Sequence, residues 1–184
     1  MSVSAPPRLR NFIDGAWHAP TGAEYLPVVN PATARPLAEV PLSPRDEVHA
    51  AVAAATRAFR QWRFVPANDR AQFLYRFKAG LESRLDELAR TITDECGKTL
   101  AEATAEIRRG IENVEVACGI PSLLQGWNNE QITPGIDEHC FRQPVGVVTA
   151  ITPFKFPAMI PLWFLPYAIA CGNCFILKPS EKVP

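Results

Sequence analysis

The chain has 184 residues, and its 19 lysines and arginines balance 19 aspartates and glutamates, so the formal net charge is zero. Hydrophobic residues make up 47% and charged residues 21% of the chain, values typical of globular domains. These values exclude intrinsic disorder, a basic nucleic-acid-binding arm and an acidic tail. Three scattered histidines give no metal-ligand spacing, so we expect no metal site.

The five cysteines are odd in number and irregularly spaced, which argues against a disulfide framework and favours a reducing, cytoplasmic compartment. Residues 1–10 contain no apolar segment of the kind that a secretory signal requires. The uncharged stretch 156–171 holds three prolines and is too short for a membrane span, so it predicts a buried helix. Cys171 and Cys174 form a C-x-x-C pair, which we interpret as structural because a helix is expected to meet a buried strand there.

The first 42 residues predict strands and turns, with Asp14-Gly15 as a tight hairpin turn and Asn30-Pro31 as a second turn. Apolar residues then recur at helical spacing, and Ser43, three residues before Asp46, resembles a helix N-cap. The first 42 residues are therefore expected to pass directly into a helical region.

Helical periodicity continues from about residue 67 to 96 and from 99 to about 118. Gly97 is expected to end one helix, and Thr99 with Glu102 predicts a capping box that opens the next. The inner face of that next helix is expected to hold Leu100, Ala103, Ile107, Ile111 and Val114. Its outer face is expected to hold Glu106, Arg108 and Glu112.

Residues 121–143 are rich in turn residues and predict a two-stranded arm, which is marginal alone and needs a surface to pack on, such as another subunit. Residues 144–184 predict a β-α-β unit with an apolar first strand, as in a parallel sheet covered on both faces. Ligands of open α/β sheets bind at the carboxyl ends of the strands. The sequence therefore predicts a binding site at residues 152–155 and 178–181.

Two groups of polar residues admit two interpretations each. No G-x-G-x-x-G loop follows the first strand, but Lys178 and Glu181 could hold a ribose diol, or they could be a solvated strand end. Arg109 could bind a carboxylate as a fixed cationic fork, or it could form a surface salt bridge. Its neighbour Gly110 would allow close approach of other backbone.

Five segments in collinear order resemble the aldehyde dehydrogenase superfamily. They are Asn11-Phe12-Ile13-Asp14-Gly15, Asn30-Pro31-Ala32-Thr33, Glu95-Cys96-Gly97-Lys98-Thr99-Leu100, Pro153-Phe154-Lys155-Phe156-Pro157 and Leu177-Lys178-Pro179-Ser180-Glu181. Residues 109–115 and 156–163 resemble more specifically the CoA-acylating branch, the methylmalonate-semialdehyde dehydrogenases.

This resemblance implies an α/β fold that is the N-terminal part of the aldehyde dehydrogenase fold, with an incomplete Rossmann-like NAD-binding domain. Residues 1–120 would supply strands and helices of the NAD-binding domain, 121–143 an oligomerisation arm, and 144–184 its first β-α-β unit. The complete enzyme is expected to be a homotetramer or homodimer, with neither nucleic acid nor a membrane as a partner.

The implied reaction is the NAD-dependent oxidation of malonate or methylmalonate semialdehyde to acetyl-CoA or propionyl-CoA with loss of carbon dioxide. Such a reaction belongs to valine, pyrimidine or inositol catabolism, with NAD as cofactor and coenzyme A as co-substrate. Arg109 matches the arginine that holds the substrate carboxylate. The implied NAD contacts are Thr152, Phe154, Lys178, Glu181 and Lys182.

Two departures from the family pattern qualify this expectation. The family's nucleophilic cysteine and glutamate base lie C-terminal of Lys178, so the 184-residue chain alone is expected to be inactive and, with its apolar sheet surface exposed, aggregation-prone. Lys155 stands where the family has an asparagine that donates a hydrogen bond to the oxyanion of the intermediate. We hypothesise that Lys155 weakens or redirects the acyl chemistry; a sequence change without such an effect is the competing explanation.

Two alternative functions stay open. A non-acylating aldehyde dehydrogenase is the first, although Arg109 and segment 156–161 argue against it. A catalytically silent NAD-binding or assembly module is the second, favoured by Lys155 and by the missing second half.

Overall fold

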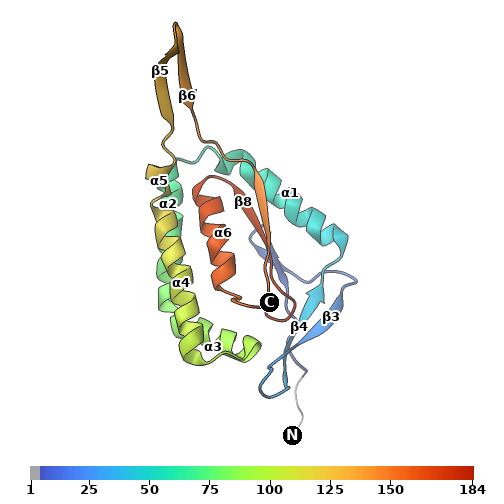
Figure 1. Ribbon diagram of the computed structural model, residues 1–184. Coiled ribbons are helices and arrows are strands. Elements are labelled where there is room, and N and C mark those ends of the chain that lie inside the picture. The colour runs from blue at the N-terminus through green and yellow to red at the C-terminus, as the bar shows by residue number, and fades with distance from the viewer. Residues whose placement is uncertain (1–4) are drawn as a thin grey trace.

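The computed structural model describes residues 5–184. Residues 1–4 lie outside the described residues. They are part of the segment 1–10, for which the sequence predicts no secretory signal. Along the chain, two strand hairpins are followed by a helical layer, a projecting hairpin and a β-α-β unit (Figure 1).

The N-terminal strands form two antiparallel pairs. They are β1 (Asn11–Ile13) with β2 (Ala16–His18), and β3 (Glu24–Val29) with β4 (Pro36–Leu42). Asp14 and Gly15 connect the first pair with φ angles of 53° and 78°, the left-handed conformation that tight hairpin turns require. The side chain of Asn30 accepts a hydrogen bond from the Ala32 N–H at 2.9 Å, which builds the second predicted turn.

Four long helices and one short one follow. They are α1 (Arg45–Trp62), α2 (Ala67–Ser83), α3 (Leu85–Cys96), α4 (Leu100–Cys118) and the single turn α5 (Ile120–Leu123). Gly97 ends α3 with a φ of 77°, and Thr99 with Glu102 forms a reciprocal capping box at the start of α4, so both predictions are confirmed.

The predicted cap at Ser43 is wrong. Helix α1 starts after Pro44 without a side-chain cap, and the Ser43 hydroxyl instead accepts a hydrogen bond from Asn11 Nδ2 at 2.8 Å. The Ser43 side chain therefore binds strand β1, 32 residues away in the sequence, and does not cap the helix that follows it.

Helix α4 packs against α2, α3 and α6, and its buried face differs from the predicted one at two positions. Leu100 is 48% exposed because it is the first residue of the helix, where little surrounds it. Glu106, expected on the outer face, is only 3% exposed. It lies three residues after buried Ala103 and four before buried Gly110, so it shares the stripe that faces α6.

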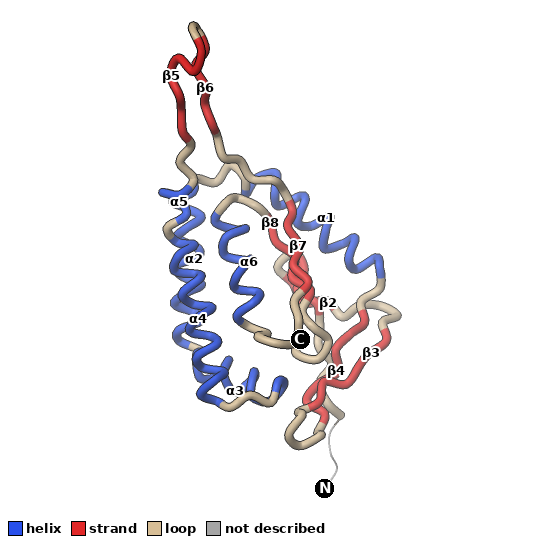
Figure 2. The backbone as a smooth tube through the Cα atoms, viewed as in Figure 1, coloured by secondary structure: helices blue, strands red, loops and turns tan. Residues whose placement is uncertain are grey.

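Strands β5 (Trp127–Thr133) and β6 (Ile136–Cys140) form an antiparallel hairpin that projects from the rest of the chain (Figures 1 and 2). Trp127, Ile132 and Ile136 are all at least half-exposed on it. This confirms the two-stranded shape of the arm, while its role in oligomerisation stays a prediction.

Strand β7 (Val147–Ile151), helix α6 (Met159–Ala170) and strand β8 (Cys174–Lys178) form the predicted β-α-β unit, with the two strands parallel. Helix α6 packs on the strands from one side and α1 from the other (Figure 1). The buried side chain of Asn173 accepts hydrogen bonds from the N–H groups of Val145 and Gly146 and so fixes the entry to β7.

Most of the stretch expected as a buried helix is found in α6, whose Met159 and Leu162 are buried, although Trp163 and Phe164 are exposed. Within residues 5–184, no helix has both the length and the apolarity that crossing a membrane demands.

The contact between α4 and α6 depends on Gly110. A Cβ atom added there would lie 2.5 Å from Leu162 Cδ1 and 3.3 Å from Leu162 Cβ, and Leu162 is buried in the core. The sequence predicted that another backbone segment approaches Gly110; the group that approaches it is instead the side chain of Leu162 on α6.

We expect Gly110→Ala to lower the melting temperature of the complete protein, because overpacking costs about 1–3 kcal/mol and outweighs a helix-propensity gain of about 1 kcal/mol. Gly80→Ala in α2 is the matched control, since no atom lies within 4 Å of its added Cβ, and it should raise the melting temperature slightly. Equal melting temperatures for the two variants would contradict this account of the α4–α6 contact.

Candidate functional site

The carboxyl ends of β7 and β8 are held side by side. The N–H of Thr152, the residue directly after β7, donates a hydrogen bond of 3.0 Å to the carbonyl of Lys178, the last residue of β8. Thr152 is buried, so the two loops that follow the strands start from a fixed junction. This is the edge at which open α/β sheets bind ligands.

The loop after β8 carries an exposed pair of opposite charges. Lys178 Nζ lies 3.7 Å from Glu181 Oε2, and the Ser180 hydroxyl accepts a hydrogen bond from the Lys182 N–H. The backbone N–H of Glu181 and the charges of Lys178 and Lys182 lower the pKa of the Glu181 carboxyl. An ionised acceptor beside an ammonium donor can bind two neighbouring hydroxyl groups, which is the arrangement of a ribose diol.

The loop after β7 reaches the same edge. Phe154 is half-exposed, and its ring centroid lies 4.9 Å from Lys182 Nζ. The backbone carbonyl of Phe154 accepts a weak hydrogen bond from Cys96 Sγ at 3.7 Å. The structure thus brings together the five residues that the resemblance assigned to NAD, two from the first loop and three from the second strand end. Their binding role itself stays a prediction.

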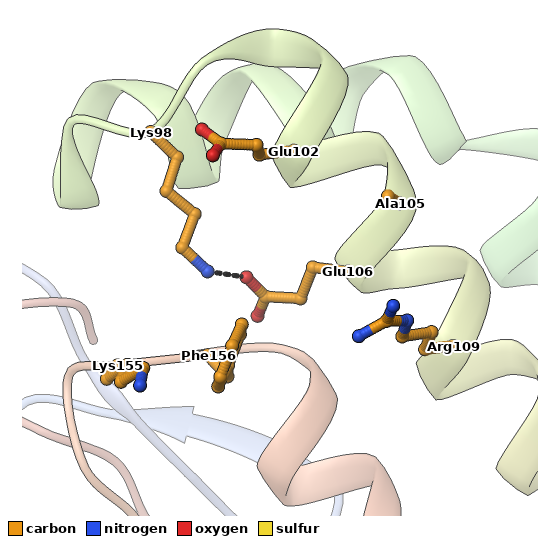
Figure 3. Close-up of a pocket in the computed structure, with 7 residues that line it drawn as sticks. All are labelled: Lys98, Glu102, Ala105, Glu106, Arg109, Lys155 and Phe156. Atoms are coloured by element: carbon orange, nitrogen blue, oxygen red, sulfur yellow. Dashed lines mark hydrogen bonds and ion pairs between the residues drawn. The ribbon is translucent and has the colours of Figure 1, made fainter.

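A pocket of about 300 Å³ that is open to solvent, called the cavity below, lies between α4 and the loop that joins β7 to α6 (Figure 3). Arg109 and Lys155, the residues expected at the substrate carboxylate and at the oxyanion, both line it. The other lining residues are Lys98, Glu102, Ala105, Glu106 and Phe156. Two positions 46 apart in the sequence therefore meet at one cavity, as the predicted chemistry requires.

The Arg109 side chain extends from α4 toward this cavity (Figure 3). Within residues 5–184, no carboxylate forms an ion pair with its guanidinium, so the surface salt bridge that the sequence left open is not formed there. The guanidinium presents its N–H donors at the cavity wall, where they can donate two parallel hydrogen bonds to a planar carboxylate.

Two cavity residues were missed by the sequence reasoning. Glu106 was expected in solvent, and Lys98 was assigned no role. In the structure they form an ion pair, and Lys98 Nζ lies 4.2 Å from the ring centroid of Phe156. The signal for Glu106 was its place on the stripe of Ala103 and Gly110; the sequence contains no comparable signal for Lys98.

The C-x-x-C pair has the environment of structural thiols. Burial raises the pKa of the Cys171 thiol, although Arg70 and Arg142 act in the opposite direction, and it raises the pKa of the Cys174 thiol as well. Reactive redox cysteines need a lowered pKa, so these observations support the structural interpretation.

The aldehyde dehydrogenase family profile matches residues 17–184, and the chain belongs to this family. Its fold is the N-terminal part of the aldehyde dehydrogenase fold, as the resemblance implied. Among its relatives, malonate-semialdehyde dehydrogenase 2 of Geobacillus thermodenitrificans is 52% identical over 176 residues, and malonate-semialdehyde dehydrogenase of Bacillus cereus is 51% identical over 177. Each alignment covers 96% of this chain and 36% of the relative.

Solved structures agree with these relatives. Methylmalonate-semialdehyde dehydrogenase from Oceanimonas doudoroffii superimposes with a TM-score of 0.92 at 45% identity, over 97% of this chain and 36% of that one. A structure from Sinorhizobium meliloti, described as a methylmalonate-semialdehyde dehydrogenase complexed with NAD, gives 0.94 at 41% identity, over 99% and 37%. The chain spans about a third of the length of these proteins.

Proposed function

We propose that this chain belongs to an NAD-dependent dehydrogenase of malonate or methylmalonate semialdehyde. The observation that carries the proposal is the guanidinium of Arg109, which lines the cavity between α4 and the loop after β7 and forms no ion pair with a carboxylate of residues 5–184. A small aldehyde with a carboxylate at its other end has the anionic group that such a cavity selects.

The chemistry of the strand-end residues fits NAD. Glu181 and Lys178 offer an acceptor and a donor for a ribose diol, while Phe154 offers an exposed ring face. The loop 152–158 contains no glycine. These side chains would therefore bind the dinucleotide in place of the glycine-rich loop that other Rossmann folds use. NAD, when bound, accepts the hydride of the aldehyde. The NAD-complexed relative supports this assignment.

In the proposed reaction, Arg109 holds the substrate carboxylate and so orients the aldehyde carbon relative to the cofactor. We assign the nucleophile to none of the five cysteines. Coenzyme A as acyl acceptor, and loss of carbon dioxide, rest on the resemblance of residues 109–115 and 156–163 to the acylating branch. The resemblance to the family as a whole supports a catabolic role and a homo-oligomer assembled through the β5–β6 arm, while the odd number and irregular spacing of the cysteines support a cytoplasmic location.

A silent NAD-binding or assembly module is the second candidate, and one observation favours it. Lys155 contributes an ammonium where the family has an amide, and its Nζ lies 5.1 Å from the ring centroid of Phe156. An ammonium is strongly hydrated, and it would place a positive charge near the cationic nicotinamide.

The test of the proposed function is NADH formation by the complete protein from malonate semialdehyde, with and without coenzyme A. We expect turnover that requires coenzyme A for its full rate, and Arg109→Met should raise the KM for the semialdehyde about 10- to 100-fold through loss of a charge-assisted contact. Arg108→Met removes the neighbouring exposed arginine, which does not line the cavity, and should leave KM unchanged.

Each other outcome of this assay overturns a stated part of the proposal. Turnover that ignores coenzyme A would contradict the acylating reaction, and equal KM values for the two arginine variants would contradict the carboxylate site. No turnover by the complete protein would favour the silent module.

Lys155→Asn tests the lysine in the cavity. If Lys155 impairs oxyanion stabilisation, the asparagine variant should raise kcat by about 10²-fold, the scale of one oxyanion donor. The KM for NAD should change little, because Lys155 is not among the strand-end residues assigned to the cofactor. An unchanged kcat would show that the lysine does not impair the site.

A further inference from the structure

Glu106 is the one buried carboxylate in the part of the chain that the structure describes. Its Oε1 accepts hydrogen bonds from the backbone N–H groups of Ala158 at 3.0 Å and Met159 at 3.2 Å. These N–H groups belong to the start of α6, where helix geometry leaves them without a partner in the helix. A side chain of α4 therefore caps the N-terminus of α6, a role that the N-cap residue of the same helix normally fills.

Helix α6 has no cap of its own to replace this one. Its N-cap residue is an alanine without a side-chain hydrogen bond, and its first turn contains no acid. Removing the Glu106 charge therefore leaves two donors at the start of α6 with a weaker acceptor or none.

The other carboxylate oxygen of Glu106 pairs with Lys98, which stands between the C-cap of α3 and the N-cap of α4. The Lys98 side chain is largely buried, and its Nζ lies over the ring of Phe156. One ion pair thus joins the α3–α4 junction, the middle of α4 and the turn into α6.

That turn holds a strained residue. Phe156 has a φ of 59°, in the left-handed region that bulky side chains rarely adopt, and it directly precedes Pro157, which disfavours helical conformations of the residue before it. Such a conformation persists only where the surroundings determine it. Lys98 contacts the Phe156 ring, and Glu106 binds the backbone two and three residues further on.

We propose that Glu106, through its pair with Lys98, is a positioning residue that fixes the turn carrying Lys155 and Phe156 at the cavity. The inference rests on the proposed function, because only in that function does the turn place Lys155 beside the reacting aldehyde. Glu106 itself contacts only the protein in this role: it acts through the backbone of residues 158 and 159.

The test compares Glu106→Gln with Glu112→Gln in the complete protein. Glutamine keeps the size of Glu106 and one oxygen acceptor but removes the charge. Glu112 lies on the exposed face of the same helix, so its variant is a matched control. Lys98→Gln is a second variant, which keeps a donor for Glu106 and removes the positive charge over Phe156.

Two readouts are measured. Amide hydrogen exchange in residues 153–162 should accelerate about tenfold in Glu106→Gln, the effect of losing one charge-assisted hydrogen bond, and stay at the wild-type rate in Glu112→Gln. The kcat for semialdehyde oxidation should fall about 10- to 100-fold through misplacement of the turn, while the KM for NAD stays within about twofold. Lys98→Gln should change both readouts in the same direction.

Unchanged exchange in this segment would overturn the proposal, and so would faster exchange spread evenly over the protein, which indicates general destabilisation. A loosened segment with unchanged kcat would show that Glu106 only caps the helix. Absence of turnover in the wild-type protein would overturn the proposed function instead, and the exchange measurement would still report whether Glu106 holds the turn.

Discussion

The arrangement of this chain depends on one buried carboxylate and the three groups that bind it. Glu106 accepts hydrogen bonds from the start of α6 and pairs with Lys98, so it connects the helical layer to the β-α-β unit. Burying a charge is costly unless it is paired and hydrogen-bonded, and here both conditions are met. The cavity that Arg109 and Lys155 line lies beside this contact, and Glu106, Lys98 and Phe156 line it too.

The loop from Thr152 to Ala158 adjoins both proposed sites because β7 and α6 are close in the sequence. Its first part adjoins β8, where Thr152 meets the Lys178 carbonyl and Phe154 meets Lys182. Its second part adjoins α4, where Phe156 lies beside Lys98. A cofactor at the first part and a small acid at the second would therefore lie next to each other, as hydride transfer requires.

Local signals in the sequence predicted local structure well. Asp14-Gly15, Gly97 and the Thr99–Glu102 pair each act within a few residues. The apolar composition of 147–151 predicted a strand, which the structure has, but not its burial: Thr149 and Ile151 are exposed, and the other three residues are only partly buried. Ser43 and Glu106 could not be assigned this way, since their partners lie 32 and 52 residues away. The cavity was predictable only in part: the resemblance pointed to Arg109 and Lys155, while Lys98 and Glu106 depend on how α4 meets α6.

A crystal structure of the complete protein with NAD and malonate, a diacid that mimics the substrate carboxylate and cannot be oxidised as an aldehyde, tests the site most directly. We predict one malonate carboxylate in a bidentate contact with Arg109 in the cavity beside Lys155, and an NAD ribose held by Glu181 and Lys178. Malonate bound away from Arg109, or an NAD ribose held by other residues, would contradict the assignment of this cavity and this sheet edge.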